Sequence, residues 1–449
     1  MINKKNNLNQ KKDSVKVWLI SVDMGYGHQR AAYPLKEIAY QRIITANNDK
    51  IISPEERKIW ENTRKLYETI SRLKTIPIIG NFVFGLYDKF QYISPFYPFR
   101  DLSKPDFETL ILKNQILKKG LCKSLIDYIK NKELPIIATH PVPAIAAYYH
   151  GLKNIYCIAT DTDIARAWVI DNPKENTITY FAPCVHVAVR LREYGISEDK
   201  IVLTGFPLPK ENIGKSQKTK EVLKKDLANR LFILDPNKVF INQYKETITK
   251  KIGRIREIKR PLTIMYAVGG AGSLIEVGSK ILKSLKEKII SNEIRIILSA
   301  GIRLHVRSYY EKIVNEIGLK EYLDKNIIIL FELSKKDYFE KFNKLLRETD
   351  ILWTKPSELS FYCGLGLPII IAPPIGYHEN YNKEWLLNLG AGFIQENPDY
   401  CVDWLFYWLQ DGRLAKAAWQ GFIDAPNTGT YLIEDYIKNN YFKNQNNRK

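Results

Sequence analysis

Three blocks of the sequence hold residue types that bind phosphates, sugars and bases. The first, residues 21–32, reads SVDMGYGHQRAA and carries Gly25, Gly27 and His28. Glycines let a backbone turn tightly and approach a ligand, and a helix that begins there offers free N–H groups to an anion. The block therefore indicates a ligand site where a strand turns into a helix, with His28 beside it.

The second block, residues 268–273, reads VGGAGS. A glycine-rich turn that opens a helix can point its amides at a diphosphate. The block lacks the G-x-x-x-x-G-K-[ST] spacing of a P-loop and the full G-x-G-x-x-G of a dinucleotide site, which disfavours ATPase and NAD chemistry. A turn with only a structural function is the alternative.

The third block spans residues 354–392 and alternates polar loops with short apolar runs. Its polar stretches are TKPSELS at 354–360 and HENYN at 378–382, separated by the glycine-containing run GLGLP. The order of strand, loop, helix, strand and loop places several donors and acceptors at one sheet edge. Sugar hydroxyls, a ribose and a uracil ring need such groups.

Strands must position these blocks, and apolar runs of the right length precede each one. Expected strands cover residues 15–22, 135–139, 155–160, 185–189 and 201–204, and the series restarts with 262–268, 294–299, 327–331, 350–353 and 368–372. Helical patterns fall between most of them, the first at 29–42. Alternating strands and helices predict parallel, doubly wound sheets. The sequence thus predicts an α/β protein with two Rossmann-like domains facing each other.

Composition excludes several other classes. The 449 residues suit two or three domains of about 100–200 residues each. Aromatic residues make up 12% of the chain, which excludes wholesale disorder. No run approaches the ~18–20 apolar residues of a membrane span, and the Asn- and Lys-rich start is not expected to act as a signal peptide. Five scattered cysteines without a C-x-x-C disfavour a disulfide framework or zinc ribbon and predict a reducing, cytoplasmic setting.

The net charge of +19 is unevenly distributed along the chain. Residues 1–210 carry 31 basic and 21 acidic side chains, residues 211–260 carry 14 and 6, and residues 261–449 carry 23 and 22. A basic surface attracts nucleic acid, anionic lipid or acidic substrates by the same long-range field. The chain has no RNA-binding signature, so nucleic acid is not an expected partner.

Residues 76–99 are crowded with aromatics, glycines and prolines, and follow a stretch rich in Arg and Lys that is expected to be helical. One interpretation is an ordinary insertion that packs inward. The other is an apolar surface flanked by cations, as in an interfacial membrane anchor or a lipid-acceptor groove.

The ordered set of motifs resembles one enzyme family. It is similar to the GT-B glycosyltransferases related to monogalactosyldiacylglycerol synthase, the processive diacylglycerol glucosyltransferases and the transferase that forms lipid II. The motifs that carry this resemblance are Gly25-Tyr26-Gly27-His28 before Ala31-Ala32, Thr139-His140-Pro141, Ala159-Thr160-Asp161 with Trp168, residues 193–207, residues 269–272, Ala300-Gly301 and residues 355–392. They occur in order over most of residues 15–395.

The resemblance implies transfer of a hexose from a UDP-linked nucleotide sugar to a lipid or membrane-associated acceptor in the cleft between two domains. It implies no bound metal and no cofactor besides the nucleotide sugar itself. The implied base is His28, with Asp23 or Asp161 as alternatives. The implied donor-binding residues are Gly269, Gly270, Ala271, Gly272, Ser273, Gly301, Arg303, Lys355, Pro356, Ser357, Glu358, Glu379 and Asn382. The implied acceptor-binding residues are Gly25, Gly27, Phe82, Phe84, Tyr87 and Trp168.

The chain departs from the family pattern in the donor block. Phe361 falls where an acid that holds the ribose is expected, and Ser357-Glu358 replace two small residues. Two alternatives therefore stay open: a sugar-nucleotide epimerase of the same fold, and a diverged GT-B module that binds a nucleotide or polyanion without catalysis.

The expected domains are an acceptor domain at 14–209, a basic linker or insertion at 210–260, a donor domain at 261–430 and a C-terminal helix and tail at 431–449. The cations of residues 1–260 and the aromatic segment predict a peripheral protein of glycolipid biosynthesis at the inner face of the cell membrane, bound to its anionic surface.

Overall fold

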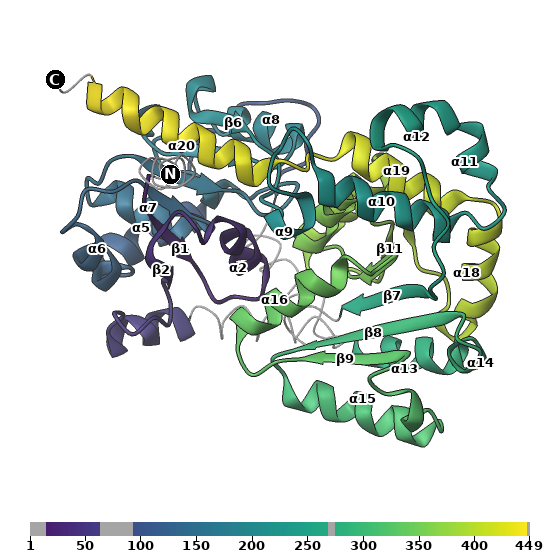
Figure 1. Ribbon diagram of the computed structural model, residues 1–449. Helices are drawn as coiled ribbons and strands as arrows, with labels where there is room; N and C mark the ends of the chain where they lie inside the picture. Colours follow the sequence, from purple (N-terminus) through teal and green to yellow (C-terminus); the bar gives the residue numbers. More distant parts are fainter. Residues whose placement is uncertain (1–14, 63–92, 268–273, 447–449) are drawn as a thin grey trace, which may run out of the picture. The chain divides into compact units, whose positions relative to one another are not determined.

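The computed structural model describes residues 15–62, 93–267 and 274–446 (Figure 1). The chain divides into two compact units. The first contains the described residues up to Met24, residues 28–207 and the chain from Gly429 onward. The second contains Gly25–Gly27 and Leu208–Thr428. Each unit is built on one parallel sheet.

The first unit has six strands in the order β2-β1-β3-β4-β5-β6, each parallel to its neighbours. The strands are β1 (Val17–Ser21), β2 (Ala39–Thr45), β3 (Ile136–Ala138), β4 (Ile155–Ile158), β5 (Thr179–Ala182) and β6 (Ile201–Leu203). The helices are α2 (Gly27–Ala32), η1 (Tyr33–Leu35), α5 (Phe107–Lys119), α6 (Lys123–Ile129), α7 (Pro141–Tyr149), η2 (Arg166–Trp168), η3 (Pro173–Glu175), α8 (Val185–Glu193), η4 (Glu198–Lys200) and α20 (Gly429–Asn446). Residues 54–62 are also helical.

The second unit has six strands in the order β12-β11-β10-β7-β8-β9, again all parallel. They are β7 (Leu262–Ala267), β8 (Ile294–Gly301), β9 (Ile327–Phe331), β10 (Ile351–Thr354), β11 (Ile369–Ile371) and β12 (Gly392–Ile394). The helices are α9 (Lys210–Ile213), α10 (Glu221–Leu234), α11 (Val239–Gln243), α12 (Lys245–Ile252), α13 (Ile275–Ser284), α14 (Lys286–Ile290), α15 (Leu304–Glu316), η5 (Lys320–Tyr322), α16 (Lys335–Leu346), η6 (Glu358–Leu365), α17 (Tyr377–Asn388), η7 (Pro398–Tyr400), α18 (Cys401–Gln410) and α19 (Arg413–Asp424).

The strand orders fix where a ligand can bind in each unit. The second sheet, counted from its own first strand, has the 3-2-1-4-5-6 order of dinucleotide-binding Rossmann sheets. The first sheet begins 2-1-3 and so reverses direction between β1 and β3. Open α/β sheets bind ligands at such reversals, beyond the carboxyl ends of the strands. The predicted fold class of two Rossmann-like, doubly wound parallel sheets is confirmed. From the reversals we expect ligands to bind after β1 and β3 in the first unit and after β7 and β10 in the second.

Two sequence expectations were wrong. Residues 185–189 begin helix α8 instead of forming a strand, because Val187, Ala188 and Leu191 recur at helical spacing and are buried together. The strand of this region is β5, just before it. The helix expected over residues 29–42 ends early, because Pro34 has no N–H to continue it. The chain then pairs with β1 as strand β2.

The last helix belongs to the first unit. Ile433 and Ile437 of α20 are buried in the same core as Val17 and Leu19 of β1 and Ile158 of β4. Burial of such side chains stabilises a fold by about 1.5–3 kcal/mol each. Helix α20, at the carboxyl end of the described chain, therefore packs in the same hydrophobic core as β1, at its amino end (Figure 1).

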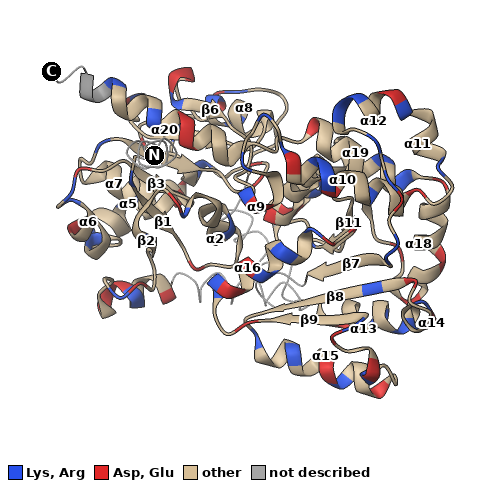
Figure 2. Cartoon of the chain, viewed as in Figure 1, with Lys and Arg blue, Asp and Glu red and all other residues tan. Residues whose placement is uncertain are grey.

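The basic segment expected as a linker or insertion forms α9 to α12 of the second unit. Arg230 of α10 is buried and donates to the carbonyl oxygens of Thr349 at 2.7 Å, Leu365 at 2.6 Å and Leu346 at 2.7 Å. These bonds fasten α10 to the loops around β10. Basic residues remain along α12 (Figure 2), where Lys245, Lys250 and Lys251 are exposed.

Glu108 lies in the first turn of α5, and its raised pKa makes the stability of the protein depend on pH. Burial, and to a lesser extent the charge of Asp106, raises the pKa of this carboxyl to about 8. Its Oε1 atom is buried without a hydrogen-bond partner. Because the folded pKa lies above the unfolded one, the protonated carboxyl stabilises the fold fully below about pH 4.5, and this stability is lost as the pH rises to about 8.

We therefore expect Glu108→Gln to be more stable than the parent above pH 8, with little difference near pH 4.5. Chemical unfolding between pH 4 and pH 9 measures both curves. Parallel curves across this range would contradict the prediction.

Candidate functional site

His28 lies in α2, directly after the loop that follows β1. Its Nδ1 atom is 2.5 Å from the carbonyl oxygen of Thr139, the residue after β3. A carbonyl oxygen only accepts, so Nδ1 must carry the hydrogen. In the neutral ring Nε2 then keeps its lone pair, which is the form a general base requires. Thr160 Oγ1, after β4, lies 3.4 Å from the same Nδ1.

A second histidine shares this end of the sheet. The ring of His140 meets the ring of His28 edge to face, with centroids 4.7 Å apart. Trp60 and Trp168 lie near His140, with ring centroids at 6.3 Å and 6.4 Å. Histidines and tryptophans thus gather where the first sheet reverses direction. The structure brings the predicted residues His28 and Trp168 to one site.

The two predicted alternative bases occupy different positions. Asp161 follows Thr160 at the end of β4 and belongs to the same sheet edge. Asp23 instead joins the loops after β1 and β2: its Oδ2 accepts from Asn48 at 2.8 Å, and its backbone exchanges two hydrogen bonds with the Asn47 amide. These contacts hold the two loops together.

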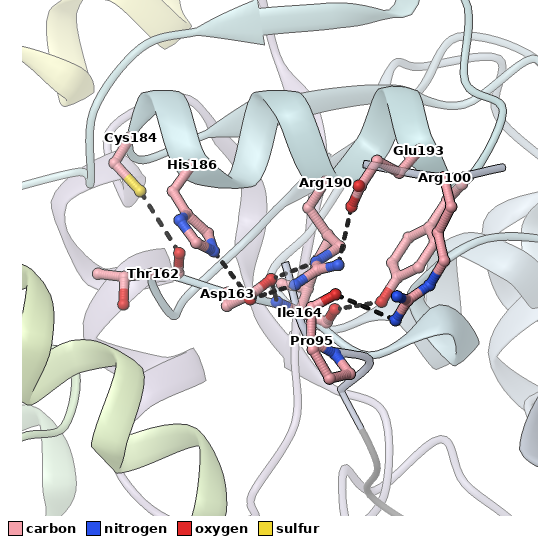
Figure 3. Close-up of polar contacts among 10 residues, drawn as sticks. Pro95, Arg100, Thr162, Asp163, Ile164, Cys184, His186, Arg190 and Glu193 are labelled. Atoms are coloured by element: carbon pink, nitrogen blue, oxygen red, sulfur yellow. Dashed lines mark hydrogen bonds and ion pairs between the residues drawn. The ribbon is translucent and has the colours of Figure 1, made fainter. Parts of the chain in front are cut away.

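A buried ion-pair network fixes the loop after β4 (Figure 3). Asp163 accepts two hydrogen bonds from Arg190, both at 2.9 Å, and its Oδ2 lies 2.9 Å from Nε2 of His186. Arg190 also donates to Glu193 at 2.8 Å. Burial raises the pKa of Asp163, but the hydrogen bonds from Arg190 and His186 outweigh it and hold this pKa below its ordinary value. The network holds the loop after β4, in which Thr160 lies beside His28.

In the second unit, Lys355 and Glu379 connect the loops after β10 and β11. Their side chains form an ion pair, and the Glu379 side chain is only 2% exposed. Glu379 Oε2 also accepts from the amides of Ile375 at 2.6 Å and Gly376 at 3.3 Å, at the start of α17. Asn382 of α17 is buried and donates to the carbonyl oxygen of Pro356 at 3.2 Å. Lys355, Pro356, Glu379 and Asn382 are therefore together, as one braced loop pair.

The other described donor candidates lie along the same sheet edge. Ser357 is buried just after Lys355, and Glu358 begins η6. Phe361, where the family places an acid, is buried and packs on Trp385 with ring centroids 5.1 Å apart. This aromatic contact gives Phe361 a packing function.

Gly301 ends β8, and Arg303 is the residue before α15. Gly301 has a φ of +68° and an added Cβ would lie 2.4 Å from the Tyr26 hydroxyl. That hydroxyl lies 3.2 Å from the amide of Ile302. Gly25 has a φ of +98°, and Gly27 starts α2. Gly301 is thus required both by its backbone and by its neighbour.

Several predicted residues lie outside the described residues, namely Gly269, Gly270, Ala271, Gly272 and Ser273 of the donor loop and Phe82, Phe84 and Tyr87 of the aromatic segment. Within the described ranges, no group of three His, Cys, Asp or Glu side chains could hold a metal ion. In the same part of the chain, no helix is long and apolar enough to cross a membrane.

Sequence reasoning did not include His140, Trp60 and Asp163 among the candidate site residues, although the structure places them at or near this sheet edge. A signal existed for His140, since it directly follows an expected strand, as His28 nearly does. None existed for Trp60, which is far from every motif in the sequence. Asp163 pairs with Arg190 across 27 residues, and no local pattern reveals such a contact.

The chain was compared with known protein families, curated sequences and solved structures. A family model described as a domain of unknown function (DUF6938) matches residues 237–432, which is less than half of the chain. No curated protein sequence matches the chain.

Several solved structures are similar at low identity. The MnaA–UDP co-structure from S. aureus is 14% identical with a TM-score of 0.45, and the alignment covers 82% of this chain and 87% of that one. MurG from Acinetobacter baumannii is 13% identical with a TM-score of 0.43, over 72% and 78%. UDP-GlcNAc 2-epimerase from Neisseria meningitidis, bound to UDP-GlcNAc, is 13% identical with a TM-score of 0.44, over 75% and 84%. All three TM-scores are below 0.5.

Proposed function

We propose that the protein transfers a hexose from a nucleotide sugar, with UDP as the nucleotide, to a hydroxyl group of a lipid or membrane-associated acceptor. The observation that carries the proposal is the position of His28 at the reversal point of the first sheet, where the bond from Nδ1–H to the Thr139 carbonyl leaves the ring's lone pair on Nε2. The acceptor would bind there, in the first unit. The donor would bind at the reversal point of the second sheet, which has the strand order of nucleotide-binding Rossmann units.

In the proposed transfer, His28 takes the proton of the acceptor hydroxyl and the nucleoside diphosphate is the leaving group. The acceptor O–H bond breaks and its proton passes to Nε2 of His28. The acceptor oxygen forms a bond to the anomeric carbon, and the bond from that carbon to the diphosphate breaks. The nucleoside diphosphate leaves with the electron pair. Preorganised N–H groups and cations can stabilise such a developing anion, and Arg303 is our candidate among the described residues.

The braced pair of loops after β10 and β11 supports the proposed donor site. Lys355 and Glu379 neutralise each other, and Glu379 also binds two amides, so this pair is suited to hold the loops rigid. Rigid loops position backbone donors and acceptors for a ribose and a base without ordering them at each binding event. We propose that Ser357 and Glu358, which follow Lys355, then face the nucleotide.

Binding of nucleotides to the full chain tests the donor site. Ligands that bind only the folded state raise its melting temperature, by an amount that grows with ligand concentration. We expect UDP and UDP-hexoses to raise it, and AMP and NAD to leave it unchanged. Calorimetric titration then gives the affinity. A chain that is folded yet binds no nucleoside diphosphate would contradict the proposal.

The acceptor part of the proposal rests on exposed apolar side chains of the first unit. Phe107, Leu110 and Leu117 fall on one face of α5 and are 64%, 49% and 49% exposed. Tyr97 and Phe99, in the preceding loop, are 70% and 60% exposed and pack on each other with ring centroids 5.0 Å apart. The cations Lys118 and Lys119 follow on α5. Apolar residues beside cations are typical of helices that lie in a membrane interface.

We expect the protein to sediment with vesicles containing phosphatidylglycerol and not with purely zwitterionic vesicles. High salt should weaken this binding without abolishing it, because screening acts on the charges and not on buried apolar groups. Replacing Phe107, Leu110 and Leu117 by Ser should remove the binding that remains at high salt. Leu333→Ser, at a 90% exposed leucine of the second unit, is the matched control. No binding to anionic vesicles at low salt would favour a non-membrane acceptor.

A further inference from the structure

His140 caps the amino end of helix α7. It is the residue before α7, with extended backbone angles, and its side chain caps the helix: Nδ1 accepts the N–H of Val142 at 3.2 Å. A ring nitrogen that accepts a hydrogen bond carries no hydrogen. The neutral ring therefore carries its hydrogen on Nε2, which is the opposite arrangement to His28.

Three features oppose a positive charge on this ring. Protonation at Nδ1 would break the cap of α7. The amino end of a helix carries positive partial charge, which disfavours a cation there. Burial, and then the neighbouring His28, lower the pKa of His140 well below its ordinary value. His140 is thus a lasting neutral N–H donor, like the neutral histidine at a helix amino end that polarises the substrate carbonyl in triosephosphate isomerase.

The two rings are complementary in hydrogen bonding. His28 offers a lone pair on Nε2 and His140 offers a hydrogen on Nε2, with ring centroids 4.7 Å apart. A hydroxyl oxygen has one hydrogen and two lone pairs. It can give the hydrogen to His28, accept the N–H of His140 with one lone pair and attack with the other.

We infer that His140 binds the reacting hydroxyl of the acceptor through Nε2–H and orients it, so that its hydrogen points to His28 and its second lone pair is directed at the donor sugar. This inference rests on the proposed function. In this inference His28 accepts the proton of the acceptor hydroxyl, and His140 stays neutral and donates a hydrogen bond to it.

Substitutions at His140 can separate its function as a hydrogen-bond donor to the acceptor from its function as the cap of α7. Asparagine is among the best residues for capping a helix, so His140→Asn keeps a partner for the Val142 amide but lacks the ring N–H. His140→Ala loses both. We expect His140→Asn to melt near the parent and to bind UDP as the parent does, while its turnover falls by about 10²-fold, the usual effect of losing one preorganised donor. An Asn variant with the turnover of the parent would overturn the inference and leave His140 as a cap only.

Nitrogen NMR of the histidine rings gives a test that needs no substrate. The chain has 6 histidines, so ¹⁵N-histidine labelling gives few signals, and loss of one set in His140→Asn assigns that residue. We expect its Nδ1 to lack hydrogen and its Nε2 to carry it at pH 7, with no change down to pH 5. A hydrogen on Nδ1, or an imidazolium at pH 5, would overturn the inference.

The two tests distinguish two failures. The expected tautomer in a protein without any transfer activity would contradict the proposed function but not the donor state of His140. The wrong tautomer in an active enzyme would contradict only the inference about His140.

Discussion

His28→Ala is expected to lower transfer turnover by about 10²–10⁴-fold, the usual contribution of a positioned base. The reason is the bond from Nδ1–H to the Thr139 carbonyl, which leaves Nε2 as the only ring nitrogen able to take a proton. Affinity for UDP should stay the same, since the nucleotide binds the other sheet in our proposal. Steady-state kinetics with calorimetric titration of UDP measure both quantities.

His150→Ala is the matched control for this experiment. His150 is an exposed histidine of the same unit, at the other end of α7 from His140. Its replacement should leave turnover unchanged. A His28→Ala protein that folds, binds UDP and turns over at the parent rate would remove His28 from the mechanism.

Asp163→Ala is expected to destabilise the first unit by about 3–5 kcal/mol, because it leaves the guanidinium of Arg190 buried without its main partner. Both side chains are 0% exposed, and two hydrogen bonds of 2.9 Å join them. The same change should loosen the loop after β4, in which Thr160 lies beside His28, so turnover should fall together with stability. Urea unfolding followed by circular dichroism measures the free energy of unfolding.

Glu198→Ala provides an unusually close control, because Glu198 pairs with another arginine of the same helix. Arg192 of α8 donates to Glu198 at 2.5 Å and 2.7 Å, but these side chains are 46% and 70% exposed. An exposed pair of this kind contributes about 0–1 kcal/mol. Similar losses of stability in both variants would contradict the assigned importance of burial.

The sequence predicted the fold through its apolar runs. Strands such as Leu262–Ala267 are buried on both faces of a parallel sheet, and such strands appear as continuous apolar stretches between turn residues. Strand β2 was missed because a helical pattern runs into it without a break, and only Pro34 marks the end of the helix. The position of α20 was not predictable either, since its burial against β1 joins residues more than 400 positions apart in the sequence.

The candidate site was predictable only in part. His28 and Trp168 were found by motif, and the strand order brings them to one edge. Lys355 and Glu379 are both expected to bind the donor, and the structure adds that their side chains form an ion pair with each other. Residue type alone cannot distinguish a charge that faces a ligand from one that is neutralised by a neighbour. The tautomers of His28 and His140 likewise depend on backbone partners that only the fold supplies.

Product analysis after incubation with a UDP-hexose tests the central claim most directly. The full chain is mixed with UDP-glucose, UDP-galactose or UDP-N-acetylglucosamine and with vesicles that contain phosphatidylglycerol and diacylglycerol. Phosphorus NMR follows the nucleotide and mass spectrometry follows the lipid. Our proposal predicts release of UDP in equal amount to a newly glycosylated lipid, with both products formed at least about 10²-fold more slowly in His28→Ala. A sugar that changes configuration while it remains attached to UDP, or a nucleotide sugar that is bound and recovered unchanged with every acceptor, would contradict the proposal.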